Sequence, residues 1–233
     1  MKILAMDSST LTGSAAVLDG GVVLAESACR VRATHSEQLL PLVREVLARA
    51  ELPLDAMDRL AVGVGPGSFT GVRIGVATAK GLAVATGLPL VGVSSLDALA
   101  EGTWALEEGA LVAAIDARRG ELYASAWRVS GGVRVECVAP CNERPAALGE
   151  LLSRVVRAGD VAWVVGDARD EDLEVLARAL PVPLRRAPGA CATPLARWVA
   201  WAAMHGRGTV DDGAMEPRYV RGSDAKLPRG VSP

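Results

Sequence analysis

The sequence is short of the residues on which metal sites and disulfide-linked folds depend. Its 233 residues include two histidines, four cysteines and 3% aromatic residues. His35 and His205 lie far apart, which leaves no histidine pair for a metal site. No two cysteines form a C-x-x-C pair and no secretory signal is recognisable. We therefore expect reduced thiols and a cytoplasmic protein without a bound metal.

Long hydrophobic runs and an excess of positive charge are missing too. The longest uncharged stretch runs from Gly81 to Leu96, is interrupted by glycine and proline, and is too short to span a membrane. The start, MKILAMD, reaches Asp7 too early for the core of a signal peptide. The formal net charge of −2 disfavours a domain that wraps nucleic acid alone. With half of its residues hydrophobic, the chain is expected to fold into a globular protein without a membrane segment.

The order of predicted elements occurs twice along the chain. An apolar strand over 3–6 ends at Asp7, and another over 111–115 ends at Asp116. Each aspartate is followed by a turn, a strand, a hairpin turn, a strand, a helix, a strand and a helix. This order predicts an α/β protein of two related lobes, each a mixed sheet flanked by helices. The predicted parts are a first lobe over 1–105, a smaller second lobe over 106–192, and a helix and tail over 193–233 that can pack back on the first lobe.

The expected elements follow from apolar periodicity and turn residues. The expected strands cover 3–6, 14–18, 22–26, 60–64, 90–93, 111–115, 121–129, 133–138 and 161–165. The expected helices cover 36–50, the stretch after the glycine-rich segment to about Thr86, a stretch from Ser94 or Ser95, 145–157, 170–180, and a stretch from Thr193-Pro194.

The glycine-rich segment GPGSFTGVRIG, residues 65–75, lies between a predicted strand and a predicted helix. Proteins use this layout to hold phosphate. The spacing does not fit a P-loop, because only three residues separate Gly67 from Gly71 and no lysine follows. It does not fit a dinucleotide-binding motif either, because the position three beyond Gly67 is Thr70 rather than glycine. We therefore expect a tight exit from the strand, with Ser68 or Thr70 as the cap of the helix.

Small residues recur at every fourth position of the helix that follows. They are Gly71, Gly75, Ala79 and Ala83. Glycine inside a helix costs about 0.5–1 kcal/mol relative to alanine, so a close approach by another backbone is expected. That backbone can belong to the chain's own sheet or neighbouring helix, or to a helix of another subunit. The spacing alone does not decide between these two interpretations.

Four stretches of the chain together resemble one protein family. They are GPGSFTGVRIG, HSEQLLP at 35–41, DARRGELY at 116–123 and PRYVR at 217–221. In this order they resemble the bacterial TsaB family, also called YeaZ. The resemblance implies the two-lobed fold of the sugar kinase/Hsp70/actin (ASKHA) superfamily. For the tail residues Tyr219 and Arg221, docking on the chain's own surface and contact with a partner both stay open.

The resemblance also implies a partner. Proteins of this family pair with TsaD, which carries the metal and the transfer chemistry that attaches threonylcarbamoyl to N6 of the tRNA adenosine after the anticodon. TsaE joins the pair, the chain alone forms a homodimer, and tRNA is contacted only through the complex. Pairing through helices of the first lobe favours the subunit-contact interpretation, so Gly75→Trp is expected to keep the fold and break pairing. The interface residues expected on this basis are Gly71, Gly75, Ala79, Ala83, Val72, Val76, His35, Leu39 and Leu40.

Active members of the superfamily bind ATP between their lobes, and the corresponding turns depart from that pattern here. Asp7-Ser8-Ser9-Thr10 lacks a glycine, Val164-Val165-Gly166-Asp167 has only one, and two arginines follow Asp116-Ala117. The hydroxyls can meet an anion or can simply bond the turn backbone. The remnant of a nucleotide site comprises Asp7, Ser8, Ser9, Thr10, Asp116 and Gly166.

These departures argue against ATP binding and against any cofactor required by this chain. No G-x-S-x-G elbow supports a Ser-His-Asp triad either, so no catalytic residue is expected. The favoured interpretation is a non-catalytic subunit. The alternative is an ATP-dependent phosphotransferase or ATPase of the same superfamily that acts alone.

Overall fold

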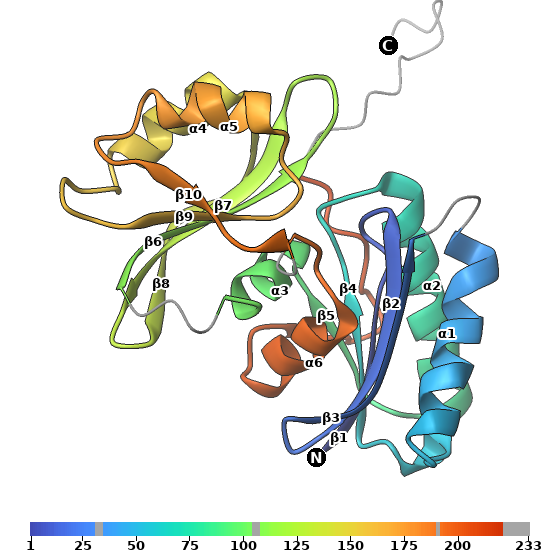
Figure 1. Ribbon diagram of the computed structural model, residues 1–233. Coiled ribbons are helices and arrows are strands. Elements are labelled where there is room, and N and C mark those ends of the chain that lie inside the picture. Colours follow the sequence, from blue (N-terminus) through green and yellow to red (C-terminus); the bar gives the residue numbers. More distant parts are fainter. Residues whose placement is uncertain (31–34, 104–107, 190–191, 221–233) are drawn as a thin grey trace, which may run out of the picture.

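The computed structural model describes residues 1–30, 35–103, 108–189 and 192–220, and it contains two sheets that are each covered by helices (Figure 1). The strands of the first sheet are β1 (Lys2–Asp7), β2 (Thr12–Asp19), β3 (Val22–Arg30), β4 (Arg59–Gly63), β5 (Leu90–Val93) and β11 (Thr209–Val210). The strands of the second sheet are β6 (Glu108–Asp116), β7 (Leu122–Ser130), β8 (Val133–Glu143), β9 (Ala162–Val165) and β10 (Leu184–Arg186).

Apart from β11, which extends the first sheet by one strand, the two sheets share one topology. Their strand orders are β11-β5-β4-β1-β2-β3 and β10-β9-β6-β7-β8. The first strand of each lobe, β1 or β6, is antiparallel to the next strand and parallel to the strand after the helix, β4 or β9. The prediction of two related lobes, each a mixed sheet flanked by helices, is confirmed.

Helices cover both faces of the first sheet because its central strands are apolar on both faces. Helices α1 (His35–Arg49) and α2 (Phe69–Thr86) lie on the face that carries Leu4 and Met6. Helix α6 (Ala196–Met204) packs on the opposite face, against Ile3 and Ala5. This alternation follows from the two-residue period of a strand. The helix that follows the second sheet therefore packs on the first.

Helix α3 (Ser95–Glu101) lies between the lobes (Figure 1). Its Leu96 and Leu99 pack with Leu111 and Ile115 on one face of the second sheet. Helices α4 (Pro145–Ser153) and α5 (Asp170–Ala177) cover the other face of that sheet. Within the described ranges, no helix combines the length and the apolar character that a membrane span requires.

The structure also contains elements that the sequence pattern did not predict. They are a 3₁₀ turn η1 (Leu54–Ala56) and the short strands β10 and β11. Strands β3 and β8 run on to Arg30 and Glu143, and α6 begins at Ala196 rather than at Thr193. The lobe boundary predicted at residue 105 falls outside the described residues and stays a prediction.

Candidate functional site

The glycine-rich segment is fastened to the turn between β1 and β2. The Ser8 hydroxyl donates a hydrogen bond to the Gly71 carbonyl at 2.8 Å, and the Ser68 amide donates to the Ser9 carbonyl at 2.6 Å. The Ser68 hydroxyl accepts a bond from the Gly71 amide at 3.2 Å, which confirms Ser68 as a cap of α2. The start of α2 and the turn thus form one hydrogen-bonded unit.

Four glycines in this region have no room for a side chain, because it would meet the turn formed by Asp7, Ser8 and Ser9. A Cβ atom on Gly71 would overlap the carbonyl oxygen of Ser8, and one on Gly75 would lie 2.6 Å from the Ser8 hydroxyl oxygen. We call this set the glycine cradle: Gly63, Gly67, Gly71 and Gly75. The glycines therefore serve the close approach of the chain's own turn.

This arrangement corrects the predicted interface. The residues of α2 that were expected to meet a partner helix are mostly buried inside the chain: Gly71, Val72, Gly75, Val76 and Ala79. The structure supports the other interpretation of their spacing, contact with the chain's own sheet. A tryptophan at Gly75 would displace Ser8, so Gly75→Trp is expected to destabilise the fold, contrary to the prediction.

The remaining predicted interface residues differ in how exposed they are. Leu39 is buried against the first sheet, Ala83 is half-buried beside the same core, and Leu40 is 37% exposed. His35 begins α1, but its side chain lies outside the described part of the chain. Of the predicted residues, Leu40 alone is both described and clearly exposed.

The outward face of α2 carries a second set of small residues. Gly81 has open space around the position of a Cβ atom, and Val84 is 86% exposed. We call this surface the exposed α2 face: Thr70, Arg73, Ala77, Gly81 and Val84. Ala77, Gly81 and Ala85 have the same four-residue spacing as the buried set. Sequence reasoning missed this face, although the polar Thr70 and Arg73 mark its direction.

Asp7 lies at the centre of the buried turn. Its carboxylate is fully buried and accepts hydrogen bonds from the amide and the hydroxyl of Ser9, both at 2.9 Å. Burial raises the pKa of Asp7 to about 7. The Thr10 hydroxyl accepts a bond from the Thr12 amide at 3.2 Å. The three hydroxyls of this turn thus have partners within the chain: the Gly71 carbonyl for Ser8, the Asp7 carboxylate for Ser9 and the Thr12 amide for Thr10.

In the second lobe, the residues at the ends of β6 and β9 also form hydrogen bonds and ion pairs with one another. The Asp116 amide donates to the Asp167 carboxylate at 3.0 Å, and the Asp116 carboxylate pairs with the Arg118 guanidinium at 3.2 Å. A Cβ atom on Gly166 would overlap the Ala114 carbonyl oxygen. Arg118 and Arg119 both have left-handed backbone conformations, with φ values of 65° and 57°.

Arg186 of β10, the strand beside β9, bonds to groups at the same end of the sheet. Its guanidinium donates to the Ala168 carbonyl at 2.6 Å and to the Asp170 carboxylate at 2.7 Å. A longer contact of 3.4 Å reaches the Gly166 carbonyl. Backbone groups that follow β9 are thereby satisfied by an arginine of the chain.

The C-terminal strap, which we define as residues 209–218, crosses the edge of the first sheet and α2. Lys80 of α2 donates to the carbonyls of Gly213 and Met215 at 3.2 and 3.1 Å. Just beyond the strap, the Tyr219 hydroxyl accepts a bond from Arg73 at 2.8 Å. Tyr219 thus docks on the chain's own surface, while Arg221 lies outside the described residues.

Potential metal ligands are scattered. Among the residues that the structure describes, no three histidine, cysteine or acidic side chains gather as metal ligands would. Cys29, Cys137 and Cys141 are free thiols. The Nδ1 atom of His205 lies 2.8 Å from the carbonyl oxygen of Trp201, one turn earlier.

Comparison with known proteins identifies the family. The model of a family described as "TsaD: tRNA N6-adenosine threonylcarbamoyltransferase" matches residues 19–160. A relative from Escherichia coli, named tRNA threonylcarbamoyladenosine biosynthesis protein TsaB, is 45% identical over 125 residues, which are 53% of each chain. The chain belongs to the TsaB (YeaZ) family. The TsaB protein of Bacillus subtilis is 35% identical over 65% of this chain and 66% of its own.

The solved structures agree with this assignment. YeaZ from Pseudomonas aeruginosa is 29% identical and superposes with a TM-score of 0.73 over 94% of this chain and 99% of its own. An activator of a CoA dehydratase from Clostridium difficile, with bound ADPNP, shares the fold alone, with a TM-score of 0.50 and 10% identity. The ASKHA-type fold is confirmed. The chain spans about half the length of the Escherichia coli and Haemophilus influenzae TsaB relatives it matches.

Proposed function

We propose that this TsaB-family chain is a non-catalytic subunit that pairs with TsaD for N6-threonylcarbamoylation of the tRNA adenosine following the anticodon. Its relatives bear the name of a biosynthesis protein for threonylcarbamoyladenosine in tRNA. The observation that supports the non-catalytic role concerns the two turns at which members of the superfamily hold a nucleotide. In this chain, both turns are hydrogen-bonded to other parts of the chain itself. Asp7 is buried behind the start of α2, and Asp116 is bonded to Arg118 and Asp167.

A nucleotide would have to displace these internal bonds on both lobes. Each buried polar group that loses its partner costs about 1–3 kcal/mol, so several such losses oppose binding. The proposal therefore requires no cofactor of this chain. The alternative function, an ATP-dependent phosphotransferase or ATPase that acts alone, requires the opposite. Calorimetry with Mg-ATP on the isolated chain separates the two.

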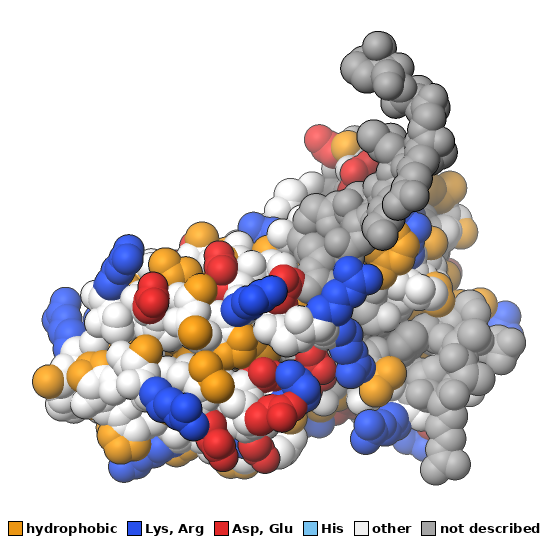
Figure 2. All heavy atoms as spheres, turned by 90° about the horizontal axis from the view of Figure 1, so that it is seen from above, with side chains coloured by type: hydrophobic (Ala, Val, Ile, Leu, Met, Phe, Trp, Pro, Cys, Tyr) orange, Lys and Arg blue, Asp and Glu red, His pale blue; other side chains and the backbone are white. Residues whose placement is uncertain are grey.

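The pairing surface in this proposal is the exposed α2 face, together with Leu40 of α1. Small residues at Ala77 and Gly81 permit the close approach of a partner helix, and the exposed Val84 gains most from burial. The same surface would form the homodimer of the isolated chain, and TsaE would join the pair with TsaD. The face seen in Figure 2 intersperses acidic and basic side chains, which fits contact with tRNA only through the complex.

Gly81→Trp tests the pairing surface. The indole would project from the exposed face where nothing opposes it, so the fold should persist while a partner helix is held away. The tagged chain is used to capture proteins from its host's cytoplasm, and bound proteins are identified by mass spectrometry. We expect a larger homologue with an H-x-x-x-H pair, and about tenfold less of it with Gly81→Trp.

Glu174→Trp is the matched control, because Glu174 is an exposed helical position on α5 of the second lobe. It should capture the partner as the unmodified chain does. Circular dichroism checks that both variants fold. If a folded Gly81→Trp variant captures the partner fully, this face is not the pairing surface. If the unmodified chain captures no such homologue, the alternative function, an enzyme that acts alone, is favoured.

A further inference from the structure

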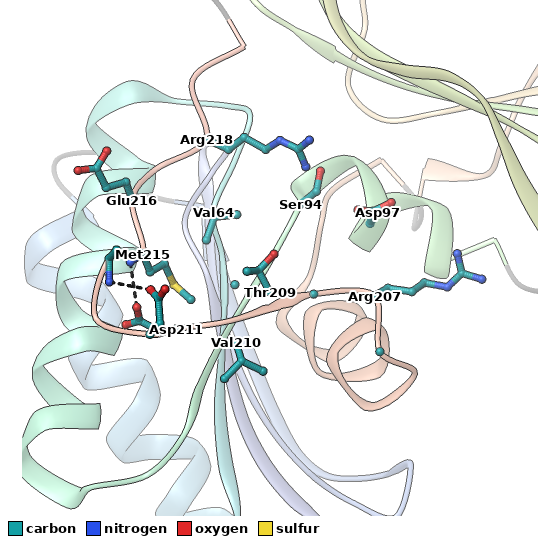
Figure 3. A pocket seen from close by; sticks show the side chains of 15 residues that line it. Val64, Ser94, Asp97, Arg207, Thr209, Val210, Asp211, Met215, Glu216 and Arg218 are labelled. Atoms are coloured by element: carbon teal, nitrogen blue, oxygen red, sulfur yellow. Dashed lines mark hydrogen bonds between the residues drawn. The ribbon is translucent and has the colours of Figure 1, made fainter.

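A pocket of about 650 Å³ lies between α3, the ends of β4 and β5, and the C-terminal strap (Figure 3). Its volume is in the range of small-molecule sites. Val64 and Ser94 of its lining directly follow β4 and β5, which are parallel neighbours. Ligands of open α/β sheets bind outside the carboxyl ends of such strands, so the pocket is at a favoured position.

The strap forms a preformed wall of this pocket. The Asp211 amide donates to the Leu90 carbonyl at 2.8 Å, and the Arg218 amide donates to the Val64 carbonyl at 2.7 Å. Between these anchors, the Asp211 carboxylate accepts a bond from the Met215 amide at 2.9 Å (Figure 3). It also accepts a bond from the Gly213 amide at 2.8 Å. A wall held at both ends and braced inside loses little entropy when a ligand binds.

Two oppositely charged side chains of the lining are not bonded to the rest of the described chain. Asp97, in the first turn of α3, is half-buried and forms no hydrogen bond or ion pair with a described residue. The guanidinium of Arg218 likewise forms none, and Figure 3 shows it extending toward the start of α3. Burial and the charge of Glu136 raise the pKa of Asp97, and the opposite effects of Arg218, Arg207 and Arg134 offset this only in part. A hydrogen-bond donor from a ligand would offset the cost of burying the charged Asp97 carboxylate.

The rest of the lining is mixed: the loop after α6 and the strap add charged side chains, and the strand side adds apolar ones beside Thr209. Val64, Val210 and Met215 line the pocket there. We propose that this pocket binds a small zwitterion with an aliphatic portion, the chemistry of a neutral α-amino acid. Its ammonium group would meet Asp97, its carboxylate would meet Arg218, and its side chain would lie on the apolar wall.

L-Valine and its two truncated analogues test this assignment. Isovalerate lacks the ammonium group and isobutylamine lacks the carboxylate, while both keep the aliphatic part. Each is titrated into the isolated full chain at matched ionic strength and followed by ¹H–¹⁵N NMR. We expect saturable shifts at the amides of Ser94 and Thr209 with L-valine, and about tenfold weaker binding of either analogue.

Asp97→Asn and Arg218→Gln should each weaken the binding of L-valine by about tenfold. The matched controls, Glu174→Gln and Arg178→Gln, change exposed side chains on or next to α5 and should leave it unchanged. The proposal is overturned if L-valine gives no saturable shifts, if an analogue binds equally well, or if the Asp97 and Arg218 variants bind as the unmodified chain does. The measurement needs no partner, so its outcome is independent of pairing with TsaD.

Discussion

At the scale of single residues, Asp7 shows how folding changes the chemistry of a carboxyl group. The side chain is fully buried, and the donors that reach it belong to Ser9. Its pKa rises from 3.8 to about 7 because burial penalises the charged form more than the Ser9 bonds favour it. Near neutral pH, about half of the molecules carry a proton here. Because Asp7 is only partly ionised near neutral pH, it does not offer a bound cation a constant negative charge.

Asp7 should make the chain less stable as the pH rises. The pKa is higher in the folded state than in the unfolded state, so the unfolded chain releases its proton first. Stability is fully present below about pH 4 and is lost as the pH rises to about 7, by about 1.4 kcal/mol per pH unit. Between pH 5 and 8, Asp7→Asn should gain about 3 kcal/mol relative to the unmodified chain, measured by urea unfolding. Parallel pH dependences of the two proteins would contradict this.

At the scale of elements, α2 has two faces with the same spacing and different roles. The glycine cradle faces the turn after β1, whereas Gly81 faces outward with open space around it. Hydrogen bonds from Ser8 and to Ser9 fix which face turns inward. The helix is thus oriented by a polar contact with the turn as well as by its apolar side chains.

Alanine at Gly71 and at Gly81 should have opposite effects. A methyl group on Gly71 would overlap the Ser8 carbonyl oxygen, so Gly71→Ala should lower the free energy of unfolding by about 2 kcal/mol. Gly81→Ala meets nothing and should raise it by about 0.5–1 kcal/mol through helix propensity. Urea unfolding measures both. Equal effects of the two substitutions would show that the cradle is not tightly packed.

Local patterns predict the helix after residue 68 and the strand before it, because apolar periodicity and turn residues are local signals. They do not predict which face of α2 is buried, since that depends on Ser8, more than sixty residues away in sequence. Strand β11 was also missed. Its two residues pair with Val91 and Gly92, and nothing within so short a segment indicates that partner. The pocket beneath the strap was missed for the same reason.

At the scale of the whole molecule, a group of charges joins the two lobes. Glu101 of α3 pairs with Arg134 of β8 and, at 3.0 Å, with Arg207 after α6. The side chains of Glu101 and Arg134 are 5% and 10% exposed, and burial lowers the pKa of Arg134. One buried carboxylate therefore holds two arginines from both lobes.

Glu101→Gln should weaken this junction. The substitution removes the negative charge that forms an ion pair with Arg134, and an unpaired buried charge costs about 3 kcal/mol. We expect the midpoint of urea unfolding to fall accordingly. Glu150→Gln, at an exposed position of α4, is the matched control and should leave the midpoint unchanged. If both variants unfold at the same concentration of urea, the pair does not hold the lobes together.

The pairing of β11 with β5 has a consequence for the order in which the chain is made. The first sheet uses strands from residues 2–93 and then Thr209–Val210. Its face that carries Ile3 and Ala5 is covered by α6. The second sheet uses strands from one continuous stretch, residues 108–186. On the ribosome the second lobe therefore has all of its strands before the first lobe does, although synthesis begins with the first. The lobe that is started first is completed last.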